Sequence, residues 1–169
     1  MAALYNNVLY LCGTSTVYET YTDFIIRKKK FHDCYINKTA LDSYLQIKNK
    51  LFEHHYKIYK IVGWSIGSMI AIIFSYDLFI NSGIKKKMYL FGVPPIGDKS
   101  FQLKYNKYLK HTTLIFNNKY DYIANPFVFV PFYLDNLINY HHVGKKIIDY
   151  KYNYSYPIVD SVFPHLSYF

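Results

Sequence analysis

Residues 63–67, with the sequence Gly-Trp-Ser-Ile-Gly, constrain this chain more than any other feature. They lie between an apolar run that predicts a strand, residues 57–62, and a longer one that predicts a helix, residues 66–80. A Gly-x-Ser-x-Gly pattern at a strand-to-helix turn is typical of a nucleophile elbow, in which two glycines allow a turn tight enough to expose the serine hydroxyl above the sheet. Ser65 is therefore the first candidate for a catalytic nucleophile.

Strands and helices are predicted to alternate along most of the chain. We expect strands over residues 7–12, 57–62, 87–93 and 111–117, and helices over residues 40–55, 66–80 and 99–109. Thr39 and Asp42 have the spacing of a capping pair at the start of the first helix, and Gly83 is expected to end the second. A hairpin is expected through residues 140–150. The alternation predicts a single α/β domain over residues 1–169, with a mostly parallel sheet.

Composition and charge narrow the class of protein. With 169 residues, 51% of them apolar and 18% charged, the chain is expected to be globular and to bury a continuous core. Its formal charge of +9 falls in short lysine runs, at residues 28–30, 85–87 and 145–146. No nucleic-acid-binding motif accompanies these runs, so nucleic acid is not an expected partner. Solvated lysines in turns are the favoured explanation of these runs, and an anionic lipid surface is a third alternative.

Cysteine usage and the apolar segments bear on the compartment. The two cysteines, Cys12 and Cys34, do not form a disulfide framework, and Cys34 is expected to be a small buried thiol. The first residues lack the features of a signal peptide, and the longest apolar segment is shorter than the roughly 18 residues of a membrane-spanning helix. We therefore expect an intracellular protein. His54 and His55 have no third ligand near them in sequence, so no metal is expected.

Hydrolysis through a serine also needs a base that takes its proton, an acid that orients the base, and backbone donors for the oxyanion. In an elbow-type fold these groups follow the order serine, acid, histidine along the chain. Asp121, directly after a predicted strand, and His165, on the C-terminal segment, supply that order after Ser65. The alternatives are Asp98 and Asp160 as the acid and His111, His141 and His142 as the base.

Several colinear blocks resemble the class 3 lipase family, the fungal-type triacylglycerol lipases. They are residues 8–15, 31–35, 62–68, 89–98 and 118–126, followed by Tyr-His-His-Val-Gly at residues 140–144. The resemblance covers nearly the whole chain. It implies an α/β-hydrolase-like fold, a mostly parallel sheet flanked by helices, shortened at its N-terminus.

By this resemblance Ser65 is the nucleophile, His165 the base and Asp121 the acid that orients it. The backbone amides of Thr14 and Ile66 would form the oxyanion hole, and Ile66 agrees with this on physical grounds because free amides point outward at a helix N-terminus. The implied activity is that of a serine-dependent lipase or esterase, hydrolysing carboxylic ester bonds of acylglycerols or phospholipids, or of smaller esters, through an acyl-enzyme intermediate. No cofactor is required.

The chain departs from the family pattern close to the nucleophile. Trp64 stands in place of a histidine and Ser68 in place of a glycine, while Cys12 and Pro95 stand where arginines are common. These departures, with the shortened N-terminus, favour an alternative: a catalytically impaired, lipase-like protein retained for lipid binding or a structural role. The intact Ser65, Asp121 and His165 argue against it.

One further segment and two histidines have a place in the resemblance. Residues 14–23 fall where such lipases carry a lid, and His32 and His142 match histidines expected to be structural. The apolar run at residues 127–133 is an acyl-binding wall, a membrane-contacting patch or a buried strand, and periodicity alone does not separate these.

Overall fold

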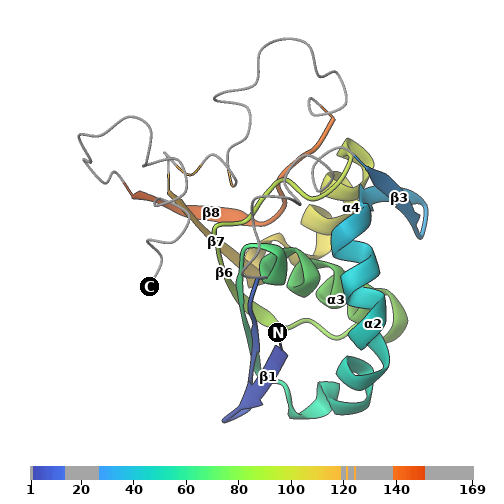
Figure 1. Ribbon diagram of the computed structural model, residues 1–169, viewed down its shortest axis with the longest axis vertical. Helices are drawn as coiled ribbons and strands as arrows, with labels where there is room; N and C mark the ends of the chain where they lie inside the picture. Colours follow the sequence, from blue (N-terminus) through green and yellow to red (C-terminus); the bar gives the residue numbers. More distant parts are fainter. Residues whose placement is uncertain (1, 14–26, 119–120, 122–123, 125–138, 151–169) are drawn as a thin grey trace.

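The computed structural model describes residues 2–13, 27–118, 121, 124 and 139–150 (Figure 1). A six-stranded sheet in the order β1-β2-β5-β6-β7-β8 forms its centre. Only β1 runs antiparallel to its neighbour, so the predicted mostly parallel sheet is confirmed. A separate hairpin pairs β3 (Lys28–Phe31) with β4 (Cys34–Asn37). The strands of the central sheet are β1 (Ala2–Tyr5), β2 (Val8–Leu11), β5 (Lys60–Trp64), β6 (Lys87–Phe91), β7 (Thr113–Asn118) and β8 (Lys145–Tyr150).

Three helices lie on the same side of this sheet (Figure 1). They are α2 (Lys38–His54), α3 (Ile66–Ser82) and α4 (Lys99–Leu109), with short 3-10 turns η1 (His55–Lys57) and η2 (Lys110–Thr112) after α2 and α4. Along each strand, successive side chains point to opposite faces of the sheet. Their buried positions form the face that packs on the helices: Leu9, Leu11, Ile61, Met88, Leu90 and Ile115.

Helix α3 is the centre of the core. Every residue from Ile66 to Leu78 is buried, which agrees with a helix that is apolar all round and packs against both α2 and the sheet. It ends as predicted at Gly83, which has a left-handed φ of 70° and whose N–H donates to the Phe79 carbonyl (2.7 Å). No helix in the described part of the chain is long and apolar enough to cross a membrane.

The predicted capping pair of α2 is wrong. The helix begins earlier, and the Asn37 side chain caps it by accepting a hydrogen bond from a first-turn backbone N–H (2.9 Å). Thr39 therefore lies inside the helix. Asp42 instead pairs with Lys29 (2.7 Å) and Lys38 (2.5 Å). The cap comes from the end of the preceding strand, which a local spacing rule does not consider.

The hairpin predicted through residues 140–150 is also wrong. Its second half is β8, which pairs in parallel with β7 and extends the sheet. The chain turns into β8 at Gly144, where φ is 84° and an added Cβ would lie 2.7 Å from the Thr113 side chain. The N–H of Gly144 donates to Oδ1 of Asn106 on α4 (2.8 Å), so a contact distant in sequence sets the direction of this strand.

Two elements were not predicted, β1 and the β3–β4 hairpin. Strand β1 turns into β2 through Asn6 and Asn7, which both have positive φ (46° and 61°), the pattern of a tight type I′ turn. Strand β5 begins at Lys60 rather than at residue 57, because residues 55–57 form η1. The remaining helix and strand predictions agree with the structure to within a few residues.

Candidate active site

Ser65 occupies the turn between β5 and α3 in an unusual backbone conformation. Its φ is 56° and its ψ is −126°, which few residues other than glycine adopt. Its N–H donates to the Phe91 carbonyl (3.0 Å), so the end of the neighbouring strand β6 holds the turn in place. The strand, strained turn and helix expected around this serine are therefore present.

The two glycines of the pentapeptide are needed for close approach. An added Cβ at Gly63 would lie 2.8 Å from Cα of Ser68, and one at Gly67 would lie 2.0 Å from the Leu11 carbonyl oxygen. The backbone of α3 thus packs directly on β5 and on the end of β2. Ser68, which departs from the family pattern, is buried and donates its hydroxyl to the Phe91 carbonyl (3.1 Å). It therefore supports the same turn.

The chain after β2 passes beside the serine. A Cβ added at Gly13 would lie 3.1 Å from Cβ of Ser65 and 3.5 Å from its hydroxyl oxygen. Ile66 is the first residue of α3, where backbone amides have no partner within the helix. Thr14, the other residue of the expected oxyanion hole, lies outside the described residues, as does the lid segment 14–23.

Asp121 lies beyond the end of β7 and is fully buried. One of its carboxylate oxygens accepts a hydrogen bond from the N–H of Ala124 (2.9 Å), and its own N–H donates to the Asn118 carbonyl (3.1 Å). Strands β5, β6 and β7 are parallel, and Ser65 and Asp121 come after the C-terminal ends of β5 and β7. The two residues therefore lie at the same end of the sheet, with β6 between their strands. Two strand spacings are about 10 Å, a gap that an imidazole side chain can bridge. His165 lies outside the described residues.

Asn117 was missed by the sequence reasoning. Its side-chain amide forms two hydrogen bonds with Val93, in the loop after β6. It accepts from the N–H of Val93 (2.8 Å) and donates to the Val93 carbonyl (3.0 Å), and we call this pair of bonds the clamp. The clamp fixes the loop between the serine turn and Asp121. An asparagine near the end of a predicted buried strand, one residue before another asparagine, was the available signal.

Two of the alternative candidates have other places in the fold. Asp98 caps α4, accepting from the N–H of Phe101 (2.8 Å) and, with its other oxygen, from the N–H of Tyr35 (3.1 Å). His111 lies in η2, before β7, and so at the opposite edge of the sheet from Ser65. Asp160 lies outside the described residues.

His142 and His141 are close together in sequence but differ in their surroundings. Burial lowers the pKa of His142 to about 4, against smaller opposite effects of the Ala124 backbone and the Asp121 carboxylate. Its ring is therefore neutral near pH 7. It borders a pocket of about 230 Å³ that Asn117 also lines. His141 is partly buried, which lowers its pKa, and its backbone bridges to Gly97.

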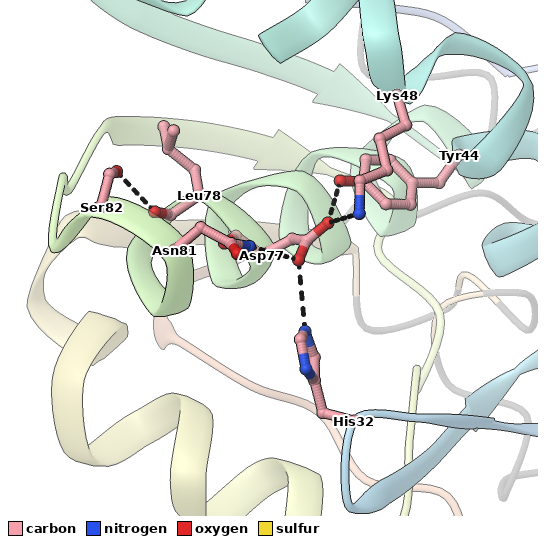
Figure 2. Close-up of polar contacts among 7 residues, drawn as sticks. All are labelled: His32, Tyr44, Lys48, Asp77, Leu78, Asn81 and Ser82. Atoms are coloured by element: carbon pink, nitrogen blue, oxygen red, sulfur yellow. Dashed lines mark hydrogen bonds and ion pairs between the residues drawn. The ribbon is translucent and has the colours of Figure 1, made fainter.

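A second polar cluster lies on α3, away from the serine turn (Figure 2). Nε2 of His32 is 3.2 Å from Oδ1 of Asp77, so His32 is a hydrogen-bonding residue. Cys34 is fully buried, and burial raises the pKa of its thiol, which disfavours the reactive thiolate. Within the described residues, no group of three His, Cys, Asp or Glu side chains could hold a metal ion.

The comparisons with known proteins identify the family and the fold. Residues 8–130 match the family model of class 3 lipases. Among solved structures, the lipase from Rhizopus microsporus var. chinensis is 18% identical with a TM-score of 0.63, covering 83% of this chain and 52% of that one. The Rhizomucor miehei triacylglyceride lipase is 19% identical with a TM-score of 0.63, covering 83% and 57%. A mutant form of MDLA from Penicillium cyclopium is 16% identical with a TM-score of 0.66, covering 83% and 54%.

By sequence, no curated protein matches the chain. The chain spans about half the length of the solved structures it resembles. At these identities the likeness shows the α/β-hydrolase fold.

Proposed function

Because this chain belongs to the class 3 lipase family, we propose that it is a serine-dependent hydrolase of carboxylic esters with Ser65 as its nucleophile. One observation carries the proposal: Ser65 is held at a positive φ of 56° in a tight turn before a buried helix. Such strain persists where the surrounding structure enforces it, and it clusters at active sites. If the residue at this position had only a structural role, glycine would be expected there, because glycine adopts this φ without strain.

In the proposed mechanism, the Ser65 hydroxyl attacks the ester carbonyl carbon while His165 takes its proton. The tetrahedral intermediate collapses, the alcohol leaves with the proton from His165, and an acyl-enzyme remains. Water activated by the same histidine then releases the carboxylic acid. Asp121 would orient His165, which agrees with its full burial and its place beyond β7. One structural neighbour, a triacylglycerol lipase 19% identical to this chain, has a serine protease triad as its catalytic centre.

The oxyanion would be held by the backbone N–H groups of Thr14 and Ile66. Ile66 is suited to this role because it immediately follows the nucleophile at the start of α3. The contact of Gly13 with Ser65 supports the same arrangement, since it brings the chain that leads to Thr14 alongside the serine.

The proposed substrates are acylglycerols or phospholipids. The apolar run at residues 127–133, an expected acyl wall or membrane patch, lies outside the described residues. Contact with anionic lipid is also a proposal, and it concerns a different surface of the molecule. Hydrolysis of a short soluble ester, a triacylglycerol emulsion and a phospholipid, measured side by side, would rank the substrate classes.

Labelling with a fluorophosphonate probe tests the nucleophile, because only an activated serine reacts with it. We expect the wild type to be labelled and Ser65→Ala to be unlabelled. Ser82→Ala is the matched control, since this serine lies on the same helix and its hydroxyl bonds the Leu78 carbonyl (2.7 Å). An unlabelled wild type would contradict the proposal and favour the impaired, lipid-binding alternative.

The histidine is tested by non-additivity. Ser65→Ala and His165→Ala should each remove nearly all hydrolysis, and the double variant should be scarcely worse than either, because the groups act as a unit. Additive losses would show that His165 is not the base. His142→Asn should then be examined, because the Asp121 carboxylate acts electrostatically on this histidine.

A further inference from the structure

Five lysines gather at the edge of the sheet where its parallel strands begin. The turn between β1 and β2 is joined to the start of β5 there, because the N–H of Tyr59 donates to the Asn7 carbonyl (2.8 Å). The end of α2 and the β1 hairpin lie at this end of the molecule (Figure 1). We call this surface the lysine edge; its members are Lys57, Lys60, Lys85, Lys86 and Lys87.

Two of these lysines are direct neighbours across the sheet. Lys60 of β5 and Lys87 of β6 occupy the same register position, and like charges side by side on adjacent strands destabilise a sheet. Among the described residues, no ion pair reaches any lysine of the edge. The ion-paired lysines lie elsewhere, and they are Lys29, Lys38, Lys48 and Lys104. The positive charge of the edge is therefore left for an external anion.

Aromatic rings hold four of these ammonium groups in place without neutralising them. The distances from Nζ to the ring centroid are 5.5 Å for Lys57 over Tyr56, 5.7 Å for Lys60 over Tyr59, 5.3 Å for Lys85 over Phe79 and 5.6 Å for Lys87 over Tyr89. A cation–π contact orients a lysine side chain but leaves its full charge. Four of the five lysines therefore keep their charge while a ring restrains the side chain.

Exposed tyrosines lie beside the lysines of this edge. Tyr59 is 73% exposed, and Tyr56 and Tyr5 are each 68% exposed. Tyr56 lies in η1, Tyr59 directly before β5, and Tyr5 is the last residue of β1, before the β1–β2 turn. Tyrosines and lysines that project from turns suit a lipid headgroup layer, where the ring sits at the interface and the ammonium reaches phosphate.

Nucleic acid would use the same charges differently. Proteins that bind single strands stack bases on free aromatic faces, whereas one face of Tyr56 and one face of Tyr59 are each occupied by a lysine ammonium group. The observations therefore favour a lipid surface over a nucleic acid.

We infer that the lysine edge is a docking surface for anionic phospholipid. It lies at the opposite edge of the sheet from Ser65, which follows the end of β5. A protein docked in this way holds its serine turn away from the membrane to which it is bound. Docking is thus separate from hydrolysis, and it does not depend on the function proposed above.

Vesicle co-sedimentation tests this docking surface. The full chain should bind phosphatidylcholine vesicles that contain phosphatidylserine and should not bind phosphatidylcholine alone, and binding should weaken as salt rises. Lys60→Gln/Lys87→Gln should reduce the affinity about 20- to 30-fold, since each lysine near an anionic surface contributes roughly a five-fold effect. Lys60→Arg/Lys87→Arg should retain binding because it keeps both charges.

The matched control removes two exposed lysines elsewhere, Lys30→Gln/Lys99→Gln, and should change the affinity less than three-fold by our estimate. Ser65→Ala should bind as the wild type does, so that failure of the hydrolase proposal leaves this result intact. Equal binding to neutral and anionic vesicles, or equal losses in the Lys60/Lys87 pair and the control pair, would overturn the inference. So would a preference for single-stranded DNA over anionic vesicles in direct competition.

Discussion

The two ends of α3 differ in how their polar side chains are held. At the first end, Ser65 is kept at a positive φ by backbone contacts and by neighbouring glycines. Farther along the helix, Asp77 is 1% exposed and is held by side chains from the β3–β4 hairpin, from α2 and from α3 itself (Figure 2). Helix α3 is therefore preceded by a residue with a strained backbone, Ser65, and carries a buried carboxylate, Asp77, whose charge is fully hydrogen-bonded. Reactivity is expected only at the first.

The Asp77 cluster is the more completely bonded of the two. Oδ2 accepts from the Tyr44 hydroxyl (2.5 Å) and pairs with Lys48 (2.8 Å), while Oδ1 accepts from Asn81 (2.9 Å) and lies 3.2 Å from the His32 ring. Burial opposes ionisation of this carboxyl, but the bonds from Lys48 and Tyr44 outweigh it and hold the pKa of Asp77 below its usual range. The cluster therefore ties α2 and the β3–β4 hairpin to α3.

The largest expected effect is at the serine end. Ser65→Ala should lower ester hydrolysis by at least about 10⁴-fold, because it removes the attacking oxygen. Its free energy of unfolding should stay within about 0.5 kcal/mol of the wild type, since alanine fits the same turn with similar strain. Initial rates and urea unfolding of the same preparation measure both quantities. A large loss of stability together with activity would make Ser65 a structural residue.

At the aspartate end the expected pattern is the reverse. Asp77→Ala should destabilise the fold by about 2–4 kcal/mol, because it leaves the buried Tyr44 hydroxyl without its partner and removes the pairing of the partly exposed Lys48 ammonium group. Asp42→Ala is the control, since Asp42 also pairs with two lysines but on the surface, where the loss should be about 1 kcal/mol or less. Urea unfolding compares the two. Equal losses would mean that the buried cluster contributes no more than a surface pair.

The glycine contacts at the serine end come next. Gly67→Ala should destabilise the protein by roughly 2–4 kcal/mol, because the new Cβ would lie 2.0 Å from the Leu11 carbonyl oxygen and helix α3 would have to move. Gly83→Ala, at the other end of the helix, meets nothing within 4 Å and should cost only about 1 kcal/mol for its left-handed φ. Thermal melts of the two variants provide the test. A smaller loss at Gly67 than at Gly83 would contradict the close packing of α3 on β2.

The first end of the helix was the more predictable of the two. Its turn follows from a local pattern, two glycines around a serine between apolar runs, so sequence alone placed it correctly. The Asp77 cluster depends on side chains brought together from β3–β4, α2 and α3, and no spacing rule indicates such a set. The same limit explains the wrong direction of residues 140–150, where Gly144 is held by Asn106 of α4. The roles of His165 and Thr14 stay predictions, since both lie outside the described residues.

As the pH falls, the stabilising effect of His142, near Asp121, should be lost before that of the Asp77 cluster. The pKa of His142 is lowered from 6.5 to about 4, so the unfolded chain binds this proton first as the pH falls. Its contribution to stability is present above pH 6.5 and is lost between pH 6.5 and about 4, by about 2–3 kcal/mol. The pKa of Asp77 is lowered from 3.8, so its contribution is lost only at still lower pH. Unfolding free energies from pH 7 to 4 should fall less steeply in His142→Asn, and parallel curves would show that this ring is not buried as a neutral group.

The smallest effect tests the strain itself. Ser65→Gly should abolish hydrolysis like the alanine variant, yet unfold at higher urea concentration than Ser65→Ala, by about 1 kcal/mol in free energy. Glycine adopts a φ of 56° freely, whereas alanine keeps a Cβ in the strained turn. Relief of that strain must exceed the extra freedom that glycine gives the unfolded chain, which offsets about 0.4–1 kcal/mol. The difference between these two inactive variants therefore measures backbone strain separately from catalysis. If Ser65→Gly is the less stable of the two, the turn is not strained, and the contrast between the ends of α3 reduces to the presence or absence of a buried charge.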